Sequence, residues 1–125
     1  MIPRFRAWHN ELGRMMLIKN MWFQDGSVEE LELNDTVMND YITAYLDEIE
    51  LMQSTGIFDK NNTEIFEGDI VRVLDSTYTV FYDNERGSYR LKPHDDRWNV
   101  DYMSNFSHGG NFEVVGNIYE NKEYL

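Results

Sequence analysis

Hydrophobic residues in the C-terminal half of the chain alternate with polar residues at a period of two. Tyr78, Val80 and Tyr82, for example, alternate with Thr79 and Phe81. A period of two is typical of strands that bury one face. The runs of this kind occupy residues 68–74, 77–83, 88–93, 98–102 and 112–120. Five short strands at close spacing predict a small antiparallel barrel or a curled sheet.

Two turn signals divide the N-terminal part into strands. The segment 10–13, Asn-Glu-Leu-Gly, separates two apolar runs, and Gly13 can take a positive φ at no steric cost. Asp25-Gly26 is a strong signal for a two-residue hairpin turn. A further strand is expected over 47–55.

After Asp35 the hydrophobic period changes to that of a helix. Asn34 or Asp35 is suitably placed to cap such a helix. We therefore expect a short helix over 36–46. The residues at helical spacing are Val37, Met38, Tyr41, Ile42, Tyr45 and Leu46.

Length and composition fit one domain, or two small lobes, of a protein that folds without covalent staples. The chain has 125 residues and no cysteine, which excludes disulfides and thiolate zinc sites. No apolar run follows Arg4 and Arg6, so the N-terminus does not resemble a signal peptide, and no segment is apolar enough to span a membrane. We expect a cytoplasmic protein.

The charge is strongly negative and unevenly distributed. A formal net charge of −12 disfavours direct binding to nucleic acid or to anionic membranes. Residues 25–50 carry nine acids and no Lys or Arg, whereas residues 1–23 carry four basic residues and one acid. This acidic segment is either a solvated face, or a surface against which the basic N-terminal hairpin packs, or a mimic of the charge of DNA.

Candidate metal and catalytic sites are weak. Residues 59–64, Asp-Lys-Asn-Asn-Thr-Glu, depart from a calcium-binding loop, because Glu64 replaces its glycine and Ile70 its bidentate glutamate. We therefore expect a turn there, in which Asp59 binds nearby backbone. The cluster His94-Asp95-Asp96, with Asp101 and His108, matches no recognised metal motif.

Motifs for a nucleophile or a phosphate-binding loop are missing. We expect no catalytic residues, no cofactor and no metal. His9, beside a turn, is expected at the surface. Aromatic residues of the C-terminal half either fill the core or line a ligand groove, and the core is the preferred interpretation. These residues are Tyr78, Phe81, Tyr82, Tyr89, Trp98 and Tyr102.

Three sequence blocks stand out: Arg-Ala-Trp at the front, a central block that runs from Thr55-Gly56 to Glu67-Gly68-Asp69, and a closing Gly-Asn-Ile-Tyr-Glu-Asn. Together these blocks resemble the YopX family of phage and prophage proteins. Asn62 stands where the family usually has glycine. The positions that match the family and are expected to shape the backbone are Trp8, Gly56, Asp59, Glu67, Gly68, Asp69, Gly116 and Asn117.

The resemblance implies a fold and a setting but no catalytic residues. It implies a β-rich fold with an SH3-like C-terminal barrel. Together with the hairpin and short helix expected from the pattern, this predicts an α+β, mainly β fold. An N-terminal hairpin and short-helix lobe over 1–52 would precede a barrel lobe over 53–125, or the two would form one continuous domain. We expect Gly68 to permit a backbone bend, Asp69 to accept backbone N–H bonds, and Glu67 to pair with Arg72 or Arg6.

The function that we expect is that of a phage or prophage accessory protein without enzymatic activity. It would act through a protein partner or through self-association. The alternatives are an acidic DNA mimic that inhibits a host nucleic-acid-binding protein and, third, a metal-dependent enzyme.

Overall fold

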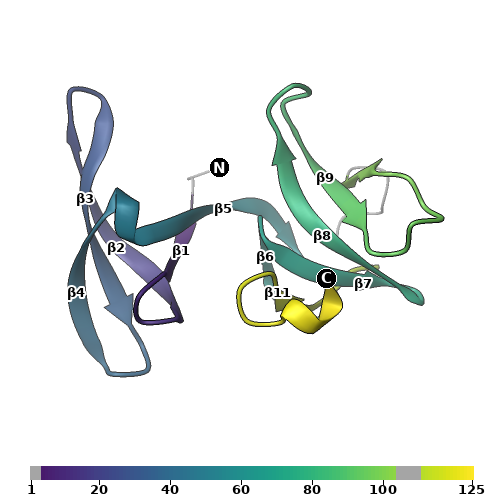
Figure 1. Ribbon diagram of the computed structural model, residues 1–125, viewed down its shortest axis with the longest axis horizontal. Coiled ribbons are helices and arrows are strands. Elements are labelled where there is room, and N and C mark those ends of the chain that lie inside the picture. The colour runs from purple at the N-terminus through teal and green to yellow at the C-terminus, as the bar shows by residue number, and fades with distance from the viewer. Residues whose placement is uncertain (1–3, 104–110) are drawn as a thin grey trace. The chain divides into compact units, whose positions relative to one another are not determined.

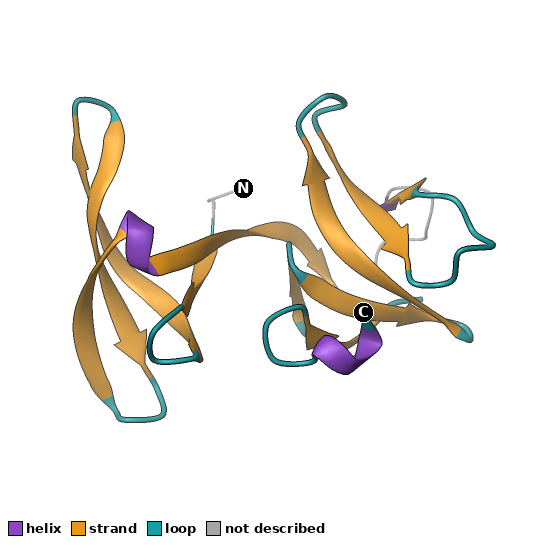
Figure 2. Cartoon of the chain, in the orientation of Figure 1, coloured by secondary structure: helices purple, strands orange, loops and turns teal. Residues whose placement is uncertain are grey.

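The computed structural model describes residues 4–103 and 111–125, and strands dominate this part of the chain (Figure 1, Figure 2). The prediction of a mainly β protein is therefore confirmed. The N-terminal strands are β1 (Phe5–His9), β2 (Arg14–Gln24), β3 (Ser27–Asp35), β4 (Asp40–Tyr45) and β5 (Ile49–Phe58). The later strands are β6 (Glu64–Phe66), β7 (Asp69–Val73), β8 (Ser76–Asp83), β9 (Ser88–Pro93), β10 (Asp101–Tyr102) and β11 (Glu113–Asn117). Single 3-10 turns form η1 (Leu46–Glu48) and η3 (Lys122–Tyr124).

The chain divides into two compact units, and the border falls between Gln53 and Ser54. Strand β5 contributes to both of them. Its first half pairs with β1, and its second half pairs with β6 across an irregularity between Ser54 and Phe58. Gly56 lies in this irregular part and has a φ of 77°. Glycine adopts a positive φ without steric cost, which suits a break in the regular strand pairing.

The N-terminal unit is an antiparallel sheet with the strand order β4-β3-β2-β1-β5. The two expected hairpins are present. Gly13 closes the first turn at a φ of 63°, and Asp25 and Gly26 form the second at 52° and 83°. Positive φ at both central residues gives the turn a twist that matches the twist of the flanking strands.

One face of this sheet is buried and holds the core of the unit. Alternation along the strands sends every second side chain to that face, and the cross-strand pairs Ala7–Met16 and Leu31–Ala44 lie on it. The fully or largely buried apolar residues are Ala7, Met16, Leu31, Leu33, Ala44 and Ile49.

The predicted helix over 36–46 is wrong. This segment forms a turn and then the strand β4. Asp35 does cap the backbone, as the sequence suggested, because its Oδ1 accepts bonds from Val37 N and Met38 N at 3.2 and 3.3 Å. The cap closes a turn instead of a helix, because Asn39 has a φ of 53°, outside the right-handed helical region, and returns the chain as a strand against β3.

The C-terminal unit contains a second antiparallel sheet with the order β10-β9-β8-β7-β11. Its core lies on the face that contains the Val80–Leu91 and Val71–Tyr78 pairs. In the described residues the sheet is open, so the expected SH3-like barrel is not confirmed. The predicted strand over 98–102 is reduced to Asp101–Tyr102. The buried core residues are Ile65, Val71, Val73, Val80, Leu91, Met103 and Phe112.

Candidate functional site

The carboxylate of Asp59 organises the turn that follows β5. Its Oδ1 accepts bonds from Asn61 N and Thr63 N, both at 2.8 Å, and its Oδ2 accepts one from Val114 N at 2.8 Å. Asn62 in this turn has a φ of 64°, the left-handed conformation that asparagine tolerates better than most residues. The predicted turn is confirmed, and it includes a bond to β11 that local sequence did not indicate.

The pKa of Asp59 lies below its ordinary value. Burial alone would raise the pKa, but the N–H groups of Val114, Thr63 and Asn61 and the charge of Lys60 outweigh it. The carboxylate is thus ionised at neutral pH and committed to backbone donors, which is the environment of a structural group and not of a general base.

Gly68 and Asp69 form the bend into β7. Gly68 has a φ of 86°, and it donates from N to Val80 O at 2.8 Å and accepts at O from Ile118 N at 2.9 Å. Asp69 is buried, and its Oδ2 accepts a bond from Phe66 N at 2.8 Å. The expected roles of both residues are confirmed.

The closing block lies against this bend. In the β7–β11 ladder Gly116 pairs with Ile70 and Asn117 with Asp69, and a bulge separates Val114 from Gly116. A Cβ built on Gly116 would lie only 2.9 Å from the Cβ of Asn121, so only glycine fits here without displacing Asn121.

The side chain of Asn117 holds the turn that follows. Its Oδ1 accepts bonds from Tyr119 N and Glu120 N at 3.0 and 2.9 Å, while Asn117 N donates to Asn121 Oδ1 at 3.1 Å. The central and closing blocks are therefore brought together as one hydrogen-bonded corner. Trp8 belongs to β1 of the N-terminal unit, where it pairs with Met15 and Glu50.

Two basic residues near the corner share one carboxylate. Arg72 pairs with Glu113, with 3.3 Å between Nη1 and Oε1, and Lys60 pairs with the same carboxylate at 3.3 Å. The cross-strand neighbours Arg72 and Glu113 lie opposite each other in the β7–β11 ladder. The pairing expected between Glu67 and Arg72 or Arg6 stays a prediction.

The basic N-terminal hairpin does contact the acidic segment, within the same chain. Arg14 Nη2 lies 2.5 Å from Asp35 Oδ2, and Asp35 is buried. The hydrogen bond from Arg14 is the main reason why the pKa of Asp35 is held below its ordinary value, and the backbone bonds of Met38 and Val37 add to it against the effect of burial. Lys19 Nζ lies 3.2 Å from Glu32 Oε1. Of the three alternatives for the acidic segment, these contacts support packing of the basic hairpin against it.

His94 and His9 have structural contacts. His94 lies between two threonines, with Nδ1 2.9 Å from Thr77 Oγ1 and Nε2 2.7 Å from Thr79 Oγ1. Burial and the charge of Lys92 lower its pKa, so the ring is neutral at physiological pH.

Residues 4–103 and 111–125 contain no cluster of metal-ligating side chains, and His108 lies outside them. His9, expected at the surface, is buried, and its Nδ1 accepts a bond from Leu12 N at 3.1 Å.

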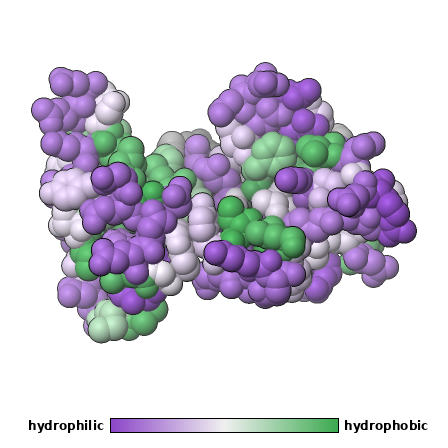
Figure 3. Space-filling view, in the orientation of Figure 1, coloured by the Kyte–Doolittle hydropathy of each residue, from purple (hydrophilic) through white to green (hydrophobic). Residues whose placement is uncertain are grey.

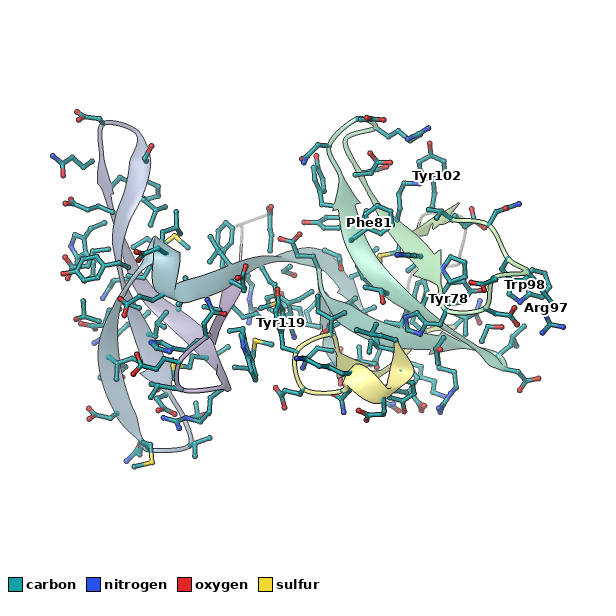
Figure 4. All side chains as sticks on the ribbon, in the orientation of Figure 1. Tyr78, Phe81, Arg97, Trp98, Tyr102 and Tyr119 are labelled. Carbon is teal, nitrogen blue, oxygen red and sulfur yellow. The ribbon has the colours of Figure 1, made fainter. Side chains whose placement is uncertain are left out.

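The aromatic residues of the C-terminal unit divide between core and surface (Figure 4). Tyr78 and Tyr89 pack against the core. Phe81 and Tyr102 are both cross-strand partners of Arg90. Directly opposite residues share a face, and Arg90 is not on the core face, so Phe81 and Tyr102 lie on the other face of the sheet. The Arg90 guanidinium stacks 4.5 Å from the centre of the Tyr102 ring, and Trp98 is exposed.

The outer face of β2, β3 and β4 carries exposed apolar residues amid acids. One cross-strand row contains Leu17, Asn34 and Tyr41, and another contains Trp22, Glu30 and Tyr45. Leu17, Trp22, Tyr41 and Tyr45 are each about half exposed, at 52, 47, 52 and 51%. Between these rows Lys19 lies 4.0 Å from the centre of the Tyr41 ring. We call Leu17, Trp22, Glu30, Glu32, Tyr41 and Tyr45 the outer patch.

Hydrophobic surface also appears where β3 turns into β4 (Figure 3). Val37 and Met38 in this turn are 69 and 65% exposed. Sequence reasoning missed the outer patch because it treated apolar residues as buried. The signal that would have found it is the alternation of Tyr41 and Tyr45 with Ile42 and Ala44, which has the period of a strand.

Comparison with known proteins identifies the family. The YopX protein family matches residues 4–125. The chain belongs to the YopX family. A similar solved structure is the crystal structure of protein EF1440 from Enterococcus faecalis, with a TM-score of 0.66 and 25% sequence identity over 100% of this chain and 99% of that one. No curated protein matches the chain.

Membership of the YopX family agrees with the sequence blocks and gives them a physical meaning. Asp59, Gly68, Asp69, Gly116 and Asn117 build the corner in which β7 meets β11. Among the described residues no helix is long and apolar enough to cross a membrane.

Proposed function

We propose that this YopX-family chain is a phage or prophage accessory protein without enzymatic activity, which binds another protein through the outer patch. The observation that carries the proposal is the gathering of Leu17, Trp22, Tyr41 and Tyr45 on one solvent-facing side of a sheet. Exposed aromatic and apolar side chains that gather on one face, with charged residues among them, are typical of protein interaction sites.

The charge around the patch favours a basic partner. Glu30 lies on the patch itself, Glu32 on the patch pairs with Lys19, and the segment 25–50 holds no Lys or Arg. Acidic rims accelerate encounter with basic partners and repel acidic ones, so association should depend on salt. The tyrosines and the tryptophan on either side of β3 supply apolar contact area of the kind that usually contributes most of the binding energy.

The corner residues support a protein without catalysis. The carboxylates of Asp59 and Asp69 bind backbone N–H groups. A DNA mimic is less well supported, since it requires free carboxylates spaced like phosphates, whereas Asp35 and Glu32 are engaged by Arg14 and Lys19. The assignment to phage or prophage rests on the family resemblance.

Affinity capture from a bacterial lysate at several salt concentrations tests the proposal. The double variant Leu17→Ser/Trp22→Ser removes apolar surface from β2 without touching the core, and Trp98→Ser is the matched control on the C-terminal unit. We expect the wild type and the Trp98→Ser variant to retain a basic partner at low salt. The amount of partner that the double variant retains should be at least about tenfold lower. Equal retention by all three proteins, or no retained partner, would contradict the proposal.

A further inference from the structure

Strand β4 is the outermost strand of the N-terminal sheet and has β3 as its neighbour (Figure 1). Along such a strand the backbone N–H groups point alternately toward the neighbour and away from it. Tyr41 N donates to Asp40 Oδ1 at 2.8 Å, and Tyr45 N donates to Glu48 Oε1 at 2.9 Å. The residues Tyr41, Thr43 and Tyr45 therefore direct their N–H groups away from β3.

The composition of this edge is unusual for an exposed strand. Natural edges are commonly protected from pairing by lysine, proline or a bulge. Residues 41–46, Tyr-Ile-Thr-Ala-Tyr-Leu, contain no charge, proline or glycine, and the register of β4 against β3 is regular. The side chains of Tyr41, Tyr45 and Leu46 are 52, 51 and 44% exposed.

Acidic side chains stand at both ends of the uncharged edge. Asp40 precedes it, and Asp47 and Glu48 follow it. The carboxylates of Asp40 and Glu48 accept hydrogen bonds from the outward N–H groups of Tyr41 and Tyr45. Thr43 lies between these two residues on the strand. A peptide that pairs with β4 would replace these two carboxylates as acceptors with its own carbonyl groups, and the released carboxylates would then be available to cations on the peptide.

We propose that the edge of β4 accepts an extended segment of the partner by strand addition, and that this segment has an uncharged centre and Lys or Arg at its ends. The inference rests on the proposed function and specifies how the partner is recognised. Backbone hydrogen bonds would supply affinity, and the acidic ends of the edge would select a basic segment.

A second copy of this chain fits the edge less well. Antiparallel pairing of two β4 strands about Thr43 would place Asp40 of one copy beside Leu46 of the other, next to Asp47 and Glu48. Acids of the two copies would then lie close together at both ends of the pair, which is unfavourable. A basic segment replaces this repulsion with attraction, and this complementarity decides the occupant.

The test uses a synthetic peptide of alternating threonine and valine with lysines at both ends, and a matched peptide with glutamates in their place. Binding is measured by titration of the isotope-labelled protein in magnetic resonance spectra. We expect the lysine peptide to shift the amide signals of β4 and to bind more weakly as salt rises, and we expect no binding of the glutamate peptide. No binding of the lysine peptide, or equal binding of both peptides, would overturn the proposal.

Two variants of Thr43 separate backbone pairing from surface attraction. Thr43→Pro removes the central outward N–H, which an edge strand tolerates, and Thr43→Val keeps it. We expect Thr43→Pro to weaken peptide binding at least about tenfold and Thr43→Val to leave it unchanged. Thermal melting of both variants confirms that the fold is retained, and equal binding by folded Thr43→Pro and Thr43→Val would refute strand addition.

The outcomes distinguish this proposal from the proposed function. If Leu17→Ser/Trp22→Ser loses the captured partner while Thr43→Pro keeps it, the outer patch binds a protein and strand addition is wrong. If the wild type sediments as a dimer that Thr43→Pro dissociates, the occupant of the edge is a second copy, and the basic segment is excluded.

Discussion

Replacing Gly68 with valine is expected to lower the free energy of unfolding by about 1–3 kcal/mol. Gly68 has a φ of 86°, which a β-branched residue adopts only under strain. Its N–H and its carbonyl also bond to Val80 and Ile118, so the backbone cannot relax without breaking the link to β8 or the link to the segment after β11. Chemical denaturation of the variant and the wild type measures the difference.

Asparagine at position 68 serves as the matched control. Asparagine tolerates a positive φ better than valine does, so we expect Gly68→Asn to lose less stability than Gly68→Val. A change within about 0.5 kcal/mol for Gly68→Val would show that the bend is not under conformational constraint.

Replacing Asp59 with alanine is expected to cost about 2–4 kcal/mol, because three backbone N–H groups lose their acceptor. These donors belong to Asn61, Thr63 and Val114. The first two groups fix the turn, and the third joins the turn to β11. Asp59→Asn keeps one acceptor oxygen and should cost less, as judged by denaturation at neutral pH.

The effect of Asp59 should also depend on pH. The pKa of this carboxyl is lowered from its ordinary value of 3.8 in the folded protein. Its contribution to stability is therefore complete well above pH 3.8 and is lost as the pH falls through the folded pKa. We expect the stability difference between the wild type and Asp59→Asn to shrink on acidification below about pH 4, and a difference that grows would contradict the assigned hydrogen bonds.

The strands and turns were predictable because their signals are local. Asp25-Gly26 and Gly13 specify backbone conformations with positive φ, and the period of two in 77–83 and 88–93 matches β8 and β9. The role of Asp69 as an acceptor of backbone bonds was also predictable, because its partner, Phe66, is three residues away.

Features that depend on distant residues were not predictable. The bond from Val114 to Asp59 spans 55 positions, and no periodicity indicates it. The apolar residues from Val37 to Leu46 have a spacing that fits a helix, but the expected helix would have buried them. In the structure Ala44 is buried and Ile42 packs against the core, whereas the other apolar residues of this segment are exposed.

This difference is itself evidence about function. Val37, Met38, Tyr41, Tyr45 and Leu46 are all exposed, in a chain where 27% of residues are charged and polar replacements were available. An apolar edge that is neither buried nor protected is a liability for aggregation. Under the proposed function, binding of a partner would offset this cost, so we place the proposed interaction on the N-terminal unit and a structural role on the corner around Asp59 and Gly68.

Photo-crosslinking inside bacterial cells tests this placement most directly. A benzoyl-phenylalanine replaces Tyr41 in one protein and Trp98 in another, since these two aromatic side chains are similarly exposed, at 52 and 55%. The account predicts a covalent adduct with a basic partner polypeptide from position 41 and none from position 98. An adduct from position 98 alone, or none from either position, would contradict it.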